Sequence, residues 1–154
     1  MECPRAQLGK EQAGRTSPYD IEYISDLWHS EALVGQTKTE VIATDEFVAW
    51  WNALPEREHD AVRDAVDLLE EFGVNLPFPH SSALGGARHA FRELRRKSGK
   101  HQLRIVYIFD EVRQAVLLIG GDKLGARKEI FYPALIRRAT RVWKQYLEEQ
   151  EGQP

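Results

Sequence analysis

The stretch RHAFRELRRKSGKHQLRIVYIFDEVRQAVLLIGGDK, residues 88–123, decides the fold. Its runs of β-branched and aromatic residues, separated by short polar turns, predict three consecutive strands over 90–97, 103–110 and 114–119. The second strand is apolar except for Arg104, and the third is apolar throughout. Strands of this kind are covered on both faces, so we expect both to lie in the middle of a sheet. The first strand differs because it is unusually basic.

The same stretch contains much of the positive charge of the chain. Although the net charge is −3, residues 88–104 hold seven Lys and Arg against one Glu. Residues 123–144 again hold seven basic residues against one acidic residue, whereas residues 40–76 hold two against ten. If these segments fold onto different sides, the protein has one acidic and one basic surface. A basic surface of this size is typical of proteins with a phosphate-bearing partner, and scattered, solvated charges are the alternative.

The segments that flank residues 88–123 predict helices. A strand over 38–43 leads into two helices, over 45–54 and 55–72, that form a hairpin with an acidic outer face. Residues 74–86 contain Pro and Gly and predict an extended connection, and Pro133 is expected to open a final helix to about Glu149. The order β–α–α–β–β–β–α indicates an α+β fold with a small antiparallel-rich sheet. We expect one face of this sheet to pack on helices and the other to be free for binding.

Length and composition set the outer limits. The 154 residues fit one domain, which we place at 38–150, after a polar extension over 1–37 that we expect to be partly disordered. Ile21, Ile24 and Trp28 in this extension favour a short helix over 18–34. The single Cys3 cannot form an internal disulfide, and neither a signal-peptide pattern nor a transmembrane-length stretch occurs. We therefore expect a cytoplasmic protein without a membrane partner.

Four short motifs in this order carry a family resemblance: Leu84-Gly85, Glu93-Leu94-Arg95, Arg104-Ile105-Val106-Tyr107 and Gly121-Asp122-Lys123. With the acidic helical hairpin before them, they resemble the RelE/ParE toxin superfamily, and within it the HigB-like, phage-derived branch. The resemblance covers about residues 38–149. It implies a RelE-like fold and the toxin of a type II toxin–antitoxin pair, with a helix-turn-helix antitoxin, the ribosome and mRNA as partners and with no cofactor.

The resemblance also implies a reaction. The 2′-hydroxyl of the mRNA attacks the adjacent phosphate and expels the 5′-oxygen, without a metal ion. Such a reaction needs cations around the phosphate, one group that accepts a proton and one that donates a proton. By position, the resemblance implies four catalytic residues, namely Arg95, Arg104, Lys123 and Tyr132. It leaves the remaining basic residues as RNA contacts, namely Arg88, Arg92, Arg96, Lys97, Lys100 and Arg127.

Several assignments stay open at this point. A lone Arg104 in an apolar strand is expensive to bury unpaired, so it points to a ligand, to an ion pair with Glu93, or to both. Tyr132 is a candidate proton donor or stacking platform, or else a buried aromatic that anchors the last helix. Strand alternation puts Arg95 on one face and Arg96 on the other, without showing which face lines the site. The basic last helix contacts phosphate or is merely solvated.

Other candidate chemistry is weaker. His80, His89 and His101 do not have the spacing of a zinc site, so we expect no metal. His101 is a candidate base, or a surface histidine in a turn. The function also has an alternative in another class: a non-enzymatic, ParE-like inhibitor of DNA gyrase, or a degenerate domain that binds only its antitoxin.

Overall fold

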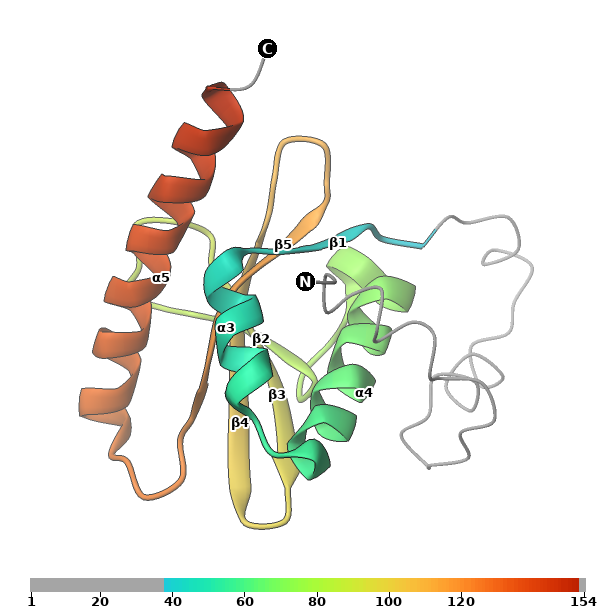
Figure 1. The fold of residues 1–154 in the computed structure, drawn as a ribbon, viewed down its shortest axis with the longest axis vertical. Helices are drawn as coiled ribbons and strands as arrows, with labels where there is room; N and C mark the ends of the chain where they lie inside the picture. Colours follow the sequence, from blue (N-terminus) through green and yellow to red (C-terminus); the bar gives the residue numbers. More distant parts are fainter. Residues whose placement is uncertain (1–37, 153–154) are drawn as a thin grey trace.

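A computed structural model describes residues 38–152 of the chain (Figure 1). Its elements are β1 (Val41–Ala43), α3 (Asp45–Ala53), α4 (Glu56–Phe72), the 3-10 turn η2 (Gly73–Asn75), β2 (Ser81–Ala83), β3 (Arg92–Ser98), β4 (His101–Phe109), β5 (Ala115–Asp122) and α5 (Lys128–Glu151). The predicted extension over 1–37 and its short helix lie outside the described residues. None of the helices within 38–152 is long and apolar enough to cross a membrane.

The five strands form one sheet in the order β1-β5-β4-β3-β2. Only the β1–β5 pair is parallel, and the other three pairs are antiparallel. The predicted α+β class, the antiparallel-rich sheet and the three-strand meander are therefore confirmed. The prediction that 74–86 is only an extended connection was wrong, because Ser81–Ala83 pairs with Leu94–Arg92 as the edge strand β2. Three residues between a proline-rich segment and a glycine pair are too few for a periodicity signal.

Helices cover both faces of the sheet. On one face, α3 and α4 bury Phe47, Trp51 and Val66 against Leu94 and Ile105 of the meander. On the other face, α5 buries a second apolar cluster against β4 and β5, which includes Val106, Leu118, Leu135 and Ala139. Figure 1 shows α5 along the side of the sheet away from the α3–α4 hairpin. The expectation of one free sheet face was therefore wrong, since the apolar stripe of the last helix needs this face for its own burial.

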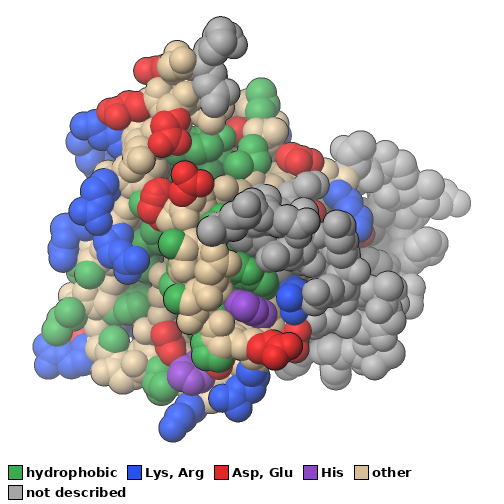
Figure 2. All heavy atoms as spheres, viewed as in Figure 1, with side chains coloured by type: hydrophobic (Ala, Val, Ile, Leu, Met, Phe, Trp, Pro, Cys, Tyr) green, Lys and Arg blue, Asp and Glu red, His purple; other side chains and the backbone are tan. Residues whose placement is uncertain are grey.

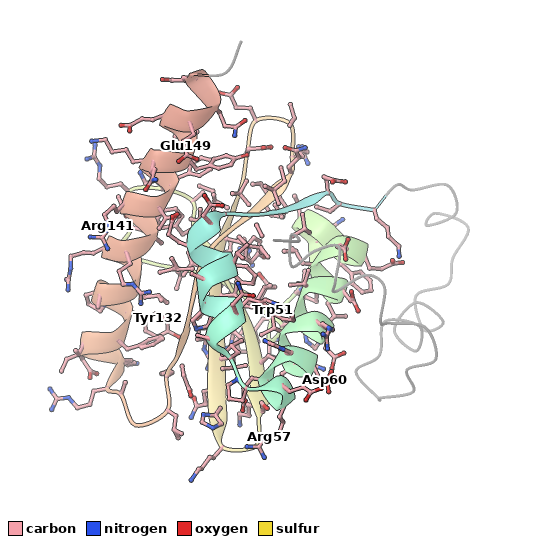
Figure 3. All side chains as sticks on the ribbon, viewed as in Figure 1. Trp51, Arg57, Asp60, Tyr132, Arg141 and Glu149 are labelled. Carbon is pink, nitrogen blue, oxygen red and sulfur yellow. The ribbon has the colours of Figure 1, made fainter. Side chains whose placement is uncertain are left out.

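The start of α5 also differs from the prediction. The helix begins at Lys128, and Pro133 lies inside it. The first backbone N–H groups of a helix lack a partner within the helix, so a proline just beyond the first turn forfeits only one hydrogen bond. The earlier start makes Tyr132 a helical residue. Its side chain is thereby directed at the sheet rather than into a loop (Figure 3).

Close contact between β5 and α3 depends on one glycine. The indole of Trp50 lies so near Gly120 that a Cβ at this position would collide with it. Thr44, which caps α3, fixes the same approach from the start of the helix, because its Oγ1 donates to the Leu117 and Leu118 carbonyls at 2.9 Å. It also accepts the Phe47 N–H at 3.2 Å. These contacts hold the hairpin against one face and leave the other to α5.

Candidate functional site

The two faces of β3 carry different side chains. Leu94 belongs to the apolar core under α4, and the Arg96 guanidinium donates to Asp64 Oδ2 of α4 at 2.9 Å. Glu93 faces the opposite way and accepts a hydrogen bond from Tyr132 of α5. By alternation, Arg95 and Lys97 share the face of Glu93. The face that the sequence left undecided is therefore the α5 side, and it brings Arg95 together with Arg104 and Tyr132.

A buried carboxylate stands at the centre of this group. The Tyr132 hydroxyl donates to Glu93 Oε1 at 2.9 Å, and the Arg104 Nε lies 3.5 Å from the same oxygen. Arg95 reaches the other oxygen, Oε2, also at 3.5 Å. Arg104 Nε lies 3.4 Å from the Tyr132 hydroxyl, and the Lys123 amine sits over the Tyr132 ring at 5.5 Å from its centroid. Strands β3 and β4, helix α5 and the turn after β5 thus supply one connected network, the Glu93 network: Glu93, Arg95, Arg104, Lys123 and Tyr132.

The strand register explains why this network needs Glu93. Arg95 and Arg104 are direct cross-strand partners, and like charges that face each other across a ladder repel. Glu93 contacts both guanidinium groups and offsets the repulsion. On the other side of Arg104, β5 presents Gly121, where a Cβ would touch Phe131 and Leu135 of α5. Both members of the ion pair expected from the sequence are buried, with 3% of each residue exposed.

The environment of Tyr132 keeps its phenol protonated. Burial raises the pKa of the Tyr132 hydroxyl, and the negative charge of Glu93 acts in the same direction. The hydrogen bond from Arg104 opposes this shift without cancelling it. At neutral pH the hydroxyl is therefore a donor, as its bond to Glu93 requires.

A groove of about 460 Å³ opens beside the network at the edge of β3. It is lined by Pro79, His80, Arg95, Arg96, Lys97 and Arg104. Lys97 is exposed, and Arg95 is half-buried. Because β2 begins opposite Leu94, the loop before β2 rather than another strand forms the far wall. The groove is wide enough for a small polar group such as a phosphate and carries basic side chains along one wall.

Five of the basic residues predicted to contact RNA lie outside the Glu93 network, and of these five Arg96 also lines the groove. The Arg92 Nε donates to Ser81 Oγ at 3.0 Å, on the α4 side, as does Arg96 toward Asp64. Arg88, Lys100 and Arg127 are exposed in the connections before β3, between β3 and β4, and before α5. The RNA-binding role of these five residues stays a prediction. Figure 2 shows further Lys and Arg side chains along the outer side of α5, and Arg141 in Figure 3 points away from the sheet.

His101 does not join the Glu93 network. Its Nδ1 donates to Asp122 Oδ2 at 2.5 Å, and its Nε2 lies 3.8 Å from Glu58 Oε1 of α4. Burial alone would raise the pKa of the Asp122 carboxyl, but hydrogen bonds from the Leu124 N–H, from His101 and from the Gln102 N–H outweigh it and lower this pKa. His101 thus connects β4 and β5 with α4, on the sheet face opposite Tyr132.

His80 of the groove and Phe78 beside it were not identified as site residues from the sequence. His80 was considered only as a metal ligand, yet it lines the groove, and its backbone carbonyl accepts the Arg95 N–H at 2.9 Å. Burial, aided by the charge of Arg96, lowers the pKa of His80, which keeps its imidazole neutral at pH 7. Phe78 is 69% exposed, and the Arg95 guanidinium lies over its ring. The one available signal was their place in the loop just before a strand that pairs with the basic strand.

Among the described residues, no cluster of three or more His, Cys, Asp or Glu side chains could hold a metal ion.

Comparison with known proteins shows which family the chain belongs to. Residues 49–144 match the model of a family described as phage-derived protein Gp49-like (DUF891). The chain belongs to the Gp49-like family. The matched residues of this Gp49-like chain include every member of the Glu93 network.

Two relatives come from Mycobacterium tuberculosis. The Gp49-like chain is 35% identical over 105 residues to "Putative toxin HigB2", a match that covers 67% of this chain and 52% of the relative. It is 34% identical over 113 residues to "Putative toxin HigB3", which covers 73% of this chain and 96% of the relative. The chain thus spans about half the length of the first relative and nearly all of the second. No solved structure shows significant similarity to the chain.

Proposed function

We propose that the protein is the toxin of a type II toxin–antitoxin pair and that it cuts mRNA on the ribosome at the groove beside β3. Both relatives are named as HigB toxins, which supports the assignment of this protein as a toxin. The observation that carries the nuclease is the convergence of Arg95, Arg104 and Lys123 with Tyr132 beside an open groove. Cations from separate strands around one hollow suit a phosphate whose charge increases in the transition state.

In the proposed reaction, the 2′-oxygen of one nucleotide forms a bond to the adjacent phosphorus. The bond from phosphorus to the 5′-oxygen of the next nucleotide breaks, which leaves a 2′,3′-cyclic phosphate and a 5′-hydroxyl. A base must take the proton of the 2′-hydroxyl, and an acid must supply one to the departing oxygen. The pentavalent phosphate carries an extra negative charge, which Arg95 stabilises from the groove and Lys123 from its place over the Tyr132 ring.

The proton-transfer roles follow from the protonation states. His80 is neutral at pH 7 and lines the groove, so its imidazole can accept the proton of the 2′-hydroxyl. Tyr132 retains its proton, so its hydroxyl can donate to the 5′-oxygen. Arg104 is almost fully buried and contacts Glu93 and Tyr132, so it acts mainly by orienting the phenol and by its charge. These roles refine the sequence prediction, in which Arg104 points to a ligand, to an ion pair with Glu93, or to both.

The test is to map mRNA 5′ ends after the protein is added to a translating extract. Wild-type protein should produce new ends at fixed positions within codons, and Arg95→Gln and Tyr132→Phe should reduce them at least tenfold. Arg113→Asn is the matched control, because Arg113 is an exposed arginine in the β4–β5 turn with φ 62°, which Asn adopts readily. Intact mRNA with the wild-type protein contradicts the proposal.

A second function is favoured by one observation. Arg104 and Glu93 are both 3% exposed, so the central cation already has a carboxylate partner. A ParE-like inhibitor of DNA gyrase or a domain that only binds its antitoxin would have the same fold with such a sealed pair. Growth arrest with DNA damage and with intact mRNA supports the inhibitor. Antitoxin binding without growth arrest supports the degenerate domain.

A further inference from the structure

We infer that Phe78 is a stacking platform for an unpaired nucleobase, next to the groove. This inference rests on the proposed function, because it names the part of the RNA that lies beside the scissile phosphate. Phe78 belongs to the loop before β2, and no member of the Glu93 network comes from that loop. The ligand is one base of single-stranded RNA, held by its π-face rather than by its hydrogen-bonding edge.

Exposure and position single out Phe78. It is 69% exposed, and it is the aromatic residue among the large exposed hydrophobic side chains of residues 38–152. The Arg95 guanidinium lies 5.3 Å from its ring centroid, and the same guanidinium lies 3.5 Å from Glu93. Arg95 therefore joins the ring to the Glu93 network. A phosphate held by Arg95 has its own nucleosides within reach of the ring.

The loop that carries Phe78 is fixed on both sides. The N–H groups of His80 and Ser81 donate to the Pro77 carbonyl at 3.0 and 3.1 Å. The Arg95 N–H donates to the His80 carbonyl at 2.9 Å, which ties the loop to β3. The ring is thus presented from a short, hydrogen-bonded turn, and little order has to be gained when a base stacks on it.

The chemistry around the ring selects a nucleic acid base over an apolar ligand. Phe78 has no polar side-chain atom, and Arg95, which lies over its ring, lines the groove together with Lys97 and Arg104. An exposed aromatic face beside a basic groove is the combination that single-stranded nucleic acid binders use. Since every base has a π-face, this contact should hold the RNA strand without strong preference for one base.

The test uses a short single-stranded RNA with 2′-O-methyl sugars, which blocks attack by the 2′-hydroxyl. One position carries 2-aminopurine, whose fluorescence falls when it stacks. Wild-type protein should quench the fluorescence of 2-aminopurine at one position. Phe78→Leu, which keeps an apolar side chain but removes the π-face, should abolish the quench and weaken binding about five-fold or more. Phe78→Trp should restore both.

Val112→Ala is the matched control, because Val112 is a 73% exposed apolar residue in the β4–β5 turn. Circular dichroism of each variant checks the fold, which an exposed side chain should not disturb. If Phe78→Leu quenches and binds like wild type while Arg95→Gln weakens binding, the platform is wrong and the proposed function stands. If wild-type protein neither binds this RNA nor cuts mRNA in the translating extract, both the stacking platform and the proposed function are overturned.

Discussion

The double role of Arg104 can be separated by replacing it together with Glu93. Arg104→Gln leaves a buried carboxylate without one of its two arginine partners, and breaking a buried ion pair typically costs about 3–5 kcal/mol. Here Glu93 keeps the Tyr132 hydroxyl at 2.9 Å and Arg95 at 3.5 Å, so we expect the lower end, about 3 kcal/mol. Glu93→Gln alone leaves the buried Arg104 without its carboxylate partner, at a similar cost. The double variant places two neutral amides side by side and should cost only about 1 kcal/mol.

Urea unfolding measures these differences, with tryptophan fluorescence as the signal, to which the buried Trp51 contributes. With a slope of about 2 kcal/mol per M, each single variant should lower the midpoint by about 1.5 M and the double variant by about 0.5 M. The coupling free energy of the pair would then be about 5 kcal/mol. If the costs of the two single variants simply add in the double variant, the buried ion pair does not stabilise the fold as the distances indicate.

Three further predictions concern the fold and the proton donor. Gly120→Ala should destabilise the protein by about 1–3 kcal/mol, because the new methyl group collides with Trp50, and Trp50→Leu in the same chain should relieve part of this loss in thermal unfolding. The pKa of Asp122 is lowered in the folded state, so its carboxylate stabilises the fold above the unfolded pKa of 3.8, and this stability is lost as the pH falls through the folded pKa. Asp122→Asn should therefore be less stable than wild type at pH 6, and the difference in stability should close below about pH 4. The pKa of Tyr132 is raised in the folded state, so its protonated hydroxyl stabilises the fold fully below pH 10.0, and this stability is lost as the pH rises through the folded pKa. The difference in unfolding free energy between wild type and Tyr132→Phe should therefore be constant from pH 6 to 9 and decline in more alkaline buffer.

The sequence predicted the meander and the helices because their apolar periodicities are long and clear. It failed where the signal was short or ambiguous. β2 has only three residues, and it forms a strand because it pairs with β3. The start of α5 was misplaced because a proline is typical of the first position of a helix, whereas Pro133 lies one turn inside α5. The second layer over the sheet was missed as well. The final helix was predicted, but a single sequence does not say which sheet face this helix covers.

For the candidate site, the sequence identified residue types better than partners. The resemblance named Arg95, Arg104, Lys123 and Tyr132, and the structure brings these four residues together around Glu93. Their catalytic roles stay predictions. Strand alternation separated Arg95 from Arg96 correctly, but only the contact of Arg96 with Asp64 showed which side meets α4. Phe78 and His80 were missed because a loop residue has no periodicity, and its place opposite β3 depends on the pairing of β2.

The most direct test of the central claim is to map mRNA ends in a translating extract with two proteins, the wild type and the Glu93→Gln/Arg104→Gln double variant. Urea unfolding should show that the two differ in stability by only about 1 kcal/mol. The wild type should produce codon-phased cuts, and the double variant should produce at least tenfold fewer, since the charge that orients Tyr132 is gone. Equal cutting by both proteins, or intact mRNA with the wild type, would contradict the claim.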